Sequence, residues 1–134
     1  NGAVDYDGSF VLTGGFLVCA GSSGMAQNVS KGSKQVSVLI TLSSSTTRLF
    51  HLQTSSGEDI ATLLPGKSYQ SILVSTPELS VGSTYKIYLG GEVTDYQSKL
   101  YGFYYDASYS PGTEYTSFTI SSTISTVGSS GTMR

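Results

Sequence analysis

Apolar residues alternate with polar ones through most of the chain after Gln35. In the first of these runs Val36, Val38, Ile40 and Leu42 occupy every second position, which is the spacing of a strand with one buried face. We expect further strands over 48–54, 59–64, 69–76, 85–89 and 115–122, where similar patterns end at Gly, Pro or Ser. The pattern predicts an all-β domain.

The opening stretch, residues 1–25, has a different pattern. Two runs suited to strands, 9–13 and 16–20, are separated by Gly14-Gly15. They could form a hairpin with a two-residue turn, or successive sides of one coil of a parallel β-helix with glycine at the corners. We therefore expect a terminal β-helix coil or strand pair over 1–27, a linker over 28–34, a β-sandwich over 35–127 and a flexible tail over 128–134.

A tyrosine corner is the most specific structural signal in the sequence. Leu79, Gly82 and Tyr85 have its spacing, in which a tyrosine at the start of a strand returns its hydroxyl group to the backbone of the preceding crossover. Tyr85, Ile87 and Leu89 would then point inward. This motif favours a small Greek-key sandwich of the immunoglobulin or fibronectin kind.

Composition narrows the function classes. The 134 residues suffice for one domain. Only 12% of residues are charged and the net charge is -2, so we expect no nucleic-acid partner. No run of about 18 apolar residues occurs, so we expect no membrane insertion.

The many β-branched and aromatic residues are typical of secreted or cell-surface β proteins. The lone Cys19 is expected to be a small buried residue. The abrupt, structured start indicates a piece of a longer protein, whose export signal would lie upstream.

Catalytic chemistry is not indicated. His51 is the single histidine and falls in the middle of a predicted strand, where a hydrogen-bonded structural histidine is expected. The nine acidic residues form no catalytic motif. Asp5 and Asp7 have the short spacing of a calcium loop, but the EF-hand register fails, because the sixth and twelfth positions are Phe10 and Phe16. This pair either caps a turn or binds calcium at a corner of a β-solenoid.

A second binding signal is aromatic. Residues 92–111 are expected to form a long loop rich in tyrosine, and such loops tend to be functional. Exposed aromatic faces stack on sugar rings while nearby carboxylates bind the hydroxyl groups. Alternatively, some of these aromatic residues pack in the core. The candidate ligand-binding residues are Tyr101, Tyr104, Tyr105, Asp106 and Tyr109.

Several segments in order resemble a known family. These are residues 1–8, 13–15, 20–27, 69–71, 79–85, Gly90-Gly91 and 111–118. Together they resemble the C-terminal portion of bacterial carbohydrate-binding domain proteins of the polygalacturonate-binding parallel β-helix type. Phe16, Cys19 and 103–105 depart from that pattern.

The resemblance implies that residues 1–27 are the last coil of a calcium-associated β-helix and that the sandwich caps it. It also implies a bacterial, secreted or cell-surface location and a polysaccharide partner, with pectic polysaccharides among the candidates. We therefore expect a non-catalytic carbohydrate-binding module or its capping domain. The alternative is a structural protein that forms homo-oligomers through its N-terminal β edge.

Overall fold

The computed structural model describes residues 10–13, 16–21, 35–65, 68–96, 98–100, 103–105, 108–110 and 112–128. Every regular element among them is a strand, so the expected all-β class is confirmed. The strands are β1 (Phe10–Thr13), β2 (Phe16–Gly21), β3 (Ser37–Thr46), β4 (Phe50–Thr54), β5 (Asp59–Leu63), β6 (Tyr69–Ser75), β7 (Thr84–Leu89), β8 (Glu92–Asp95), β9 (Ser98–Leu100), β10 (Phe103–Tyr105), β11 (Ser108–Ser110), β12 (Thr113–Thr119) and β13 (Ile124–Val127).

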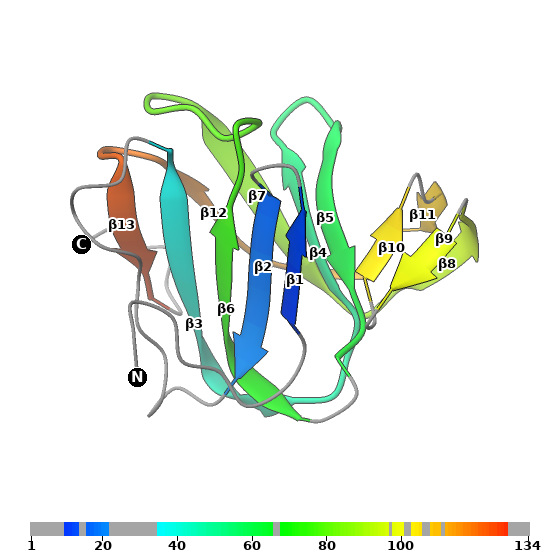
Figure 1. Ribbon diagram of the computed structural model, residues 1–134. Coiled ribbons are helices and arrows are strands. Elements are labelled where there is room, and N and C mark those ends of the chain that lie inside the picture. Colours follow the sequence, from blue (N-terminus) through cyan, green and yellow to red (C-terminus); the bar gives the residue numbers. More distant parts are fainter. Residues whose placement is uncertain are drawn as a thin grey trace.

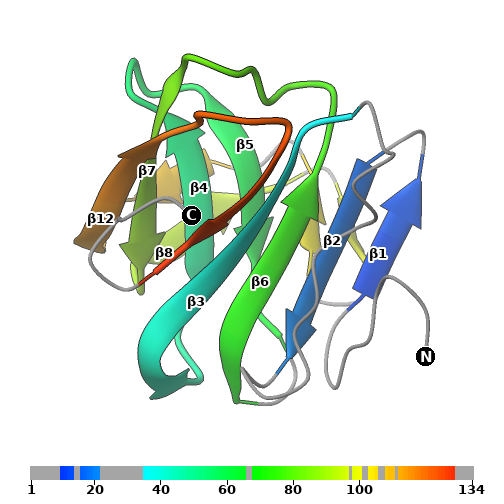
Figure 2. The ribbon, with the colours of Figure 1, turned by 90° about the vertical axis from the view of Figure 1, so that its left-hand side faces the viewer.

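Two larger sheets pack face to face as a β-sandwich (Figures 1 and 2). One has the order β1-β2-β6-β3-β13, and the other has the order β12-β7-β4-β5-β10-β9. Both contribute alternate apolar residues to one core, which includes Ile40 and Val74 from the first sheet and Leu52 and Ile87 from the second. The period-two pattern of the sequence is therefore the pattern of the core.

Strands β1 and β2 form an antiparallel hairpin. Their register pairs Phe10 with Cys19 and Thr13 with Phe16, so the two-residue Gly14-Gly15 segment joins them. Strand β2 also pairs with β6, which makes the hairpin one end of the five-stranded sheet. Of the two interpretations of this stretch, the parallel β-helix coil is wrong for these strands, because sides of a coil would pair in parallel with neighbouring coils. The linker at 28–34 lies outside the described residues.

The corner between β6 and β7 has the hydrogen bond expected of a tyrosine corner. The Ser80 amide donates to the Tyr85 hydroxyl oxygen at 2.8 Å. Gly82 adopts a φ of 93°, which a residue with a side chain would reach only with strain, and Leu79 is buried beside the core. Along β7 buried and partly exposed residues alternate, and the buried ones are Tyr85, Ile87 and Leu89, as predicted.

The segment expected to be a long loop contains four short strands. Strands β8 and β11 form a separate two-stranded antiparallel sheet, and β9 and β10 pair antiparallel between them in the sequence. Strand β10 also joins β5 through the pair Phe103 and Leu63. We call strands β8 to β11 the aromatic lobe; it lies on the side of the molecule away from β13 (Figure 1).

Strand β13, near the end of the described chain, was also not predicted. Strand β13 follows β12, changes sheets and pairs in parallel with β3, with Ile124 opposite Ser37. Strands that pair in parallel, such as β3 and β13, are far apart in the sequence, so no local hairpin motif predicts their pairing. The alternation of β-branched and small polar residues in Ile124–Val127 was the available signal.

Candidate functional site

His51 is the centre of a polar cluster on the outer face of the six-stranded sheet. Strand β4 directs Phe50 and Leu52 into the core, so His51 between them faces the opposite side. In register, His51 lies opposite Thr62 on β5 and Tyr88 on β7. Despite this outward position, His51 has an exposed fraction of 0%. Something on the outer face therefore covers it.

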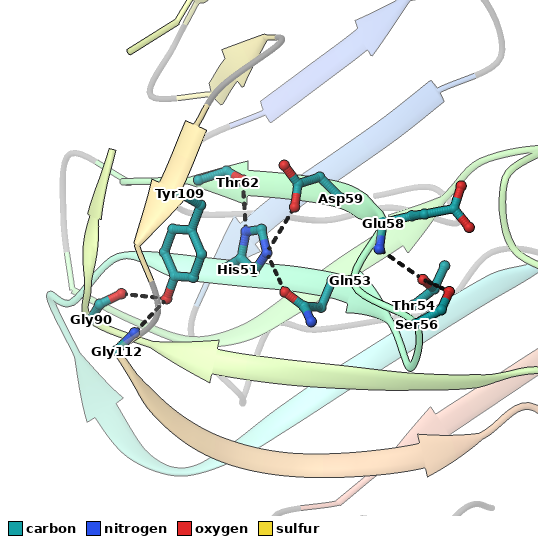
Figure 3. A network of polar contacts seen from close by, with 10 residues as sticks. All are labelled: His51, Gln53, Thr54, Ser56, Glu58, Asp59, Thr62, Gly90, Tyr109 and Gly112. Atoms are coloured by element: carbon teal, nitrogen blue, oxygen red, sulfur yellow. Dashed lines mark hydrogen bonds and ion pairs between the residues drawn. The ribbon is translucent and has the colours of Figure 1, made fainter. Parts of the chain in front are cut away.

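The cover is Tyr109 from strand β11. Its ring is stacked on the imidazole with 3.8 Å between centroids and 11° between planes, as Figure 3 shows. The Tyr109 hydroxyl donates to the Gly90 carbonyl at 2.7 Å and accepts from the Gly112 amide at 3.1 Å. Tyr109 thus joins the lobe to Gly90, where the chain leaves β7, and to Gly112, where the chain enters β12.

Glycine residues occupy both of these points of the chain, Gly90-Gly91 on one side and Gly112 on the other. Gly91 has a φ of 86°, and a Cβ atom there would overlap the Ser110 carbonyl oxygen. A Cβ atom on Gly112 would meet the backbone of Leu89 and of Gly90. The two chain segments therefore cross at a distance that only glycine allows.

The ring nitrogens of His51 have partners on both sides. Nδ1 lies 2.8 Å from the Thr62 hydroxyl oxygen, and Nε2 lies 3.0 Å from Gln53 Oε1 and 3.3 Å from Asp59 Oδ1. Two oxygen acceptors at Nε2 favour a proton on that nitrogen, so that Nδ1 accepts from the Thr62 hydroxyl group. The neutral imidazole is therefore fully hydrogen-bonded.

Burial lowers the pKa of His51 below its ordinary value. The nearby Asp59 carboxylate and the Gln53 hydrogen bond act in the opposite direction and are outweighed. Asp59 is 46% exposed, so water screens its charge. We conclude that His51 is neutral at pH 7.

Hydroxyl, imidazole and carboxylate here are the groups of a nucleophilic triad. Thr62 and His51 are both buried, and Tyr109 covers the imidazole. Thr62 is 3% exposed, and its hydroxyl oxygen contacts Nδ1 of His51. The contacts seen in this conformation are hydrogen bonds within the sheet and the stacking of Tyr109.

A second aromatic pair lies within the lobe. Tyr96, which follows β8, meets Tyr104 of β10 edge to face, with 5.0 Å between ring centroids and 75° between planes. Tyr96 is 47% exposed and Tyr104 is partly buried. Glu92 and Asp95 on the neighbouring strand β8 are exposed. The lobe thus combines an accessible aromatic surface with carboxylates.

The structure places only some of the predicted site residues. Tyr104 packs edge to face against the exposed Tyr96, whereas one face of Tyr109 is occupied by His51. Tyr105 ends strand β10. Tyr101, Asp106, Asp5 and Asp7 lie outside the described residues. The predicted set omitted Tyr96, although its position beside Asp95 and its place in the tyrosine-rich segment were available signals.

Comparison of the sequence with models of protein families, with curated proteins and with solved structures gave no match. Within the described part of the chain, no three His, Cys, Asp or Glu side chains are grouped to hold a metal ion. No helix in the same part is long and apolar enough to cross a membrane.

Proposed function

We propose that this chain is a non-catalytic carbohydrate-binding module, or the domain that caps one, at a bacterial cell surface. The observation that carries the proposal is the edge-to-face pair that the exposed Tyr96 forms with the partly buried Tyr104 on the aromatic lobe. A sugar ring presents an apolar C–H face to such a surface. Exposed carboxylates of Glu92 and Asp95 nearby are suited to accept hydrogen bonds from its hydroxyl groups.

The sandwich supports this use of the lobe. A binding surface on short strands is useful only if a rigid scaffold holds it. The lobe is tied to the sandwich at three places: the glycine crossing, the pairing of Phe103 with Leu63, and the stacking of Tyr109 on His51. The Tyr96 ring thus has a defined position relative to the sheets.

Affinity electrophoresis in gels containing polygalacturonate, pectin or other plant polysaccharides, with and without calcium, tests the proposal. We expect retardation by at least one polysaccharide. Migration unchanged in every gel, under both conditions, would refute carbohydrate binding by this chain. A response only with calcium would direct attention to Asp5 and Asp7.

A pair of variants locates the surface. Tyr96→Ala is expected to weaken binding by about twofold to tenfold, because an aromatic contact contributes about 0.5–1.5 kcal/mol. Val81→Ser is the matched control, since Val81 is 52% exposed and lies at the tyrosine corner, outside the lobe. Equal weakening by both variants would remove the lobe from the proposal.

A second candidate function, self-association, is favoured by the position of β1. This strand ends the five-stranded sheet, and its residues Phe10–Thr13 carry no charge and no proline. Uncharged edge strands are templates for pairing with another chain. A second copy of this chain is the partner that we propose for this edge.

Light scattering over a concentration series tests the assembly candidate. Leu12 belongs to this edge strand, and Leu12→Lys would put a charge on it. We expect this variant to lower the average mass, with circular dichroism showing that the sandwich is still folded. A wild-type mass that stays monomeric at every concentration would exclude this function.

We also propose the finer Greek-key class, like that of immunoglobulin or fibronectin domains. Its support is the path of the chain between the two sheets. The chain crosses from one sheet to the other between β3 and β4, between β5 and β6, and between β6 and β7. The tyrosine corner lies at the last of these crossovers.

A further inference from the structure

We propose that the stacked pair of Tyr109 and His51 is an acid-sensitive latch. At neutral pH it holds the two-stranded sheet of β8 and β11 against the outer face of the six-stranded sheet, and proton uptake by His51 releases the two-stranded sheet. The latch concerns the position of these two strands of the lobe and does not depend on carbohydrate binding.

The geometry makes Tyr109 the piece that moves. Among the elements around His51, strands β4, β5 and β7 are continuous members of one sheet. Strand β11 instead pairs with β8 in a sheet of its own. Tyr109 reaches His51 only by stacking, and its hydroxyl group bonds to the backbone at the glycine crossing. Moving β11 outward would uncover the imidazole without breaking the six-stranded ladder.

The groups that face His51 include one carboxylate. Strand β4 supplies Gln53, and β5 supplies Asp59 and Thr62. Strand β7 supplies Tyr88, and β11 supplies Tyr109. Lys86 of β7 lies opposite Gln53 in the register. Lys86 forms an ion pair with Glu114 at 3.8 Å, and Arg48 acts on Tyr109 electrostatically. Among the residues that the structure describes, the half-exposed Asp59 is therefore the only anion that acts directly on an imidazolium at this position.

Proton uptake disturbs the cluster at Nδ1. In the neutral ring Nδ1 accepts from Thr62, whereas in the charged ring it must donate, so the Thr62 hydroxyl group has to turn and find another acceptor. The charge would also be buried beneath Tyr109. Water reaches the ring once Tyr109 moves away. The open lobe therefore accommodates the charged ring better than the closed lobe does.

The direction of the pH effect follows from linkage. Burial lowers the pKa of His51 in the closed state, and exposure in the open state returns it toward about 6.5. The closed state then binds fewer protons, so closure is unaffected above pH 6.5 and weakens as the pH falls below it. For one proton, the open fraction rises at most about thirtyfold between pH 7.5 and pH 5.

Amide hydrogen exchange measured by NMR tests the latch. Protection factors of the β8 and β11 amides, corrected for the intrinsic exchange rate, are compared at pH 7.5 and pH 5 with those of β4 and β7. We expect protection in β8 and β11 to fall by about threefold to thirtyfold while β4 and β7 stay protected. A change within twofold in β8 and β11, or a parallel loss in all four strands, would overturn the proposal.

Two charge-removing variants make the assignment specific. Asp59→Asn removes the carboxylate that favours the charged ring, so the release midpoint is expected to move to lower pH. Glu114→Gln is the matched control, because it removes the same charge on the same sheet from a side chain paired with Lys86. If Asp59→Asn leaves the midpoint in place, or Glu114→Gln moves it equally, His51 is not the group that titrates.

Discussion

Two of the tyrosines whose hydroxyl groups bond to the backbone differ sharply in their surroundings, since Tyr85 lies inside the sandwich and Tyr109 on its surface. Tyr85 is buried in the core and its hydroxyl oxygen accepts from the Ser80 amide, five residues away in the chain. Tyr109 lies outside the six-stranded sheet, and its hydroxyl group bridges Gly90 and Gly112. The chemistry of the two contacts is alike, but their surroundings differ.

Because of these surroundings, we expect Tyr85 to matter for the stability of the whole fold and Tyr109 to matter for the position of the lobe. Tyr85 packs against Phe118 with 5.8 Å between ring centroids, and both side chains belong to the apolar cluster. Tyr109 packs against an imidazole that can take up a proton. Loss of the first contact should affect the whole fold, whereas loss of the second should affect the lobe.

Tyr85→Ala should produce the largest loss of stability. Truncating a buried aromatic side chain costs about 3–5 kcal/mol, and the Ser80 amide also loses its acceptor. Urea unfolding followed by circular dichroism measures this loss. A cost below about 1 kcal/mol would show that the corner contributes little, and the comparison with Tyr109 would then fail.

Glycine substitutions provide the next test. Gly82 and Gly91 both have positive φ, but space around Gly82 is open, whereas a Cβ atom at Gly91 would overlap the Ser110 carbonyl oxygen. Gly82→Ala should cost about 1–2 kcal/mol from backbone strain alone. Gly91→Ala should cost about 2–5 kcal/mol, because overlap adds to the strain. Equal costs in thermal unfolding would mean that the glycine crossing relaxes easily.

Tyr109→Ala should cost less than Tyr85→Ala, about 1–2 kcal/mol, since no core cavity is formed. Its more specific effect is on His51. Without the ring above it the imidazole gains water, so its pKa should rise toward the ordinary value of about 6.5. Histidine NMR titration measures this change directly. An unchanged pKa would show that Tyr109 does not provide the burial.

The same comparison explains what sequence analysis could predict. The tyrosine corner is local, so the spacing of Leu79, Gly82 and Tyr85 sufficed. The contact of Tyr109 with His51 depends on the return of β11 across the face of another strand, which no local pattern encodes. Alternation predicted the core strands, but it did not distinguish a hairpin from a coil at residues 9–20. That choice depended on pairing with β6, a distant partner.

The smallest expected effects come from removing only the hydroxyl groups. Tyr85→Phe removes the hydroxyl oxygen that accepts from the Ser80 amide at the tyrosine corner and should cost about 1 kcal/mol. Tyr109→Phe should cost about 0.5 kcal/mol, because water can reach the half-buried Gly90 and Gly112 groups that it leaves. The stacked ring remains in Tyr109→Phe, so the pKa of His51 should stay low, unlike in Tyr109→Ala. If Tyr109→Phe instead raises this pKa as far as Tyr109→Ala does, the hydroxyl bridge rather than the stacking contact holds the lobe closed, and the latch would lie at the glycine crossing.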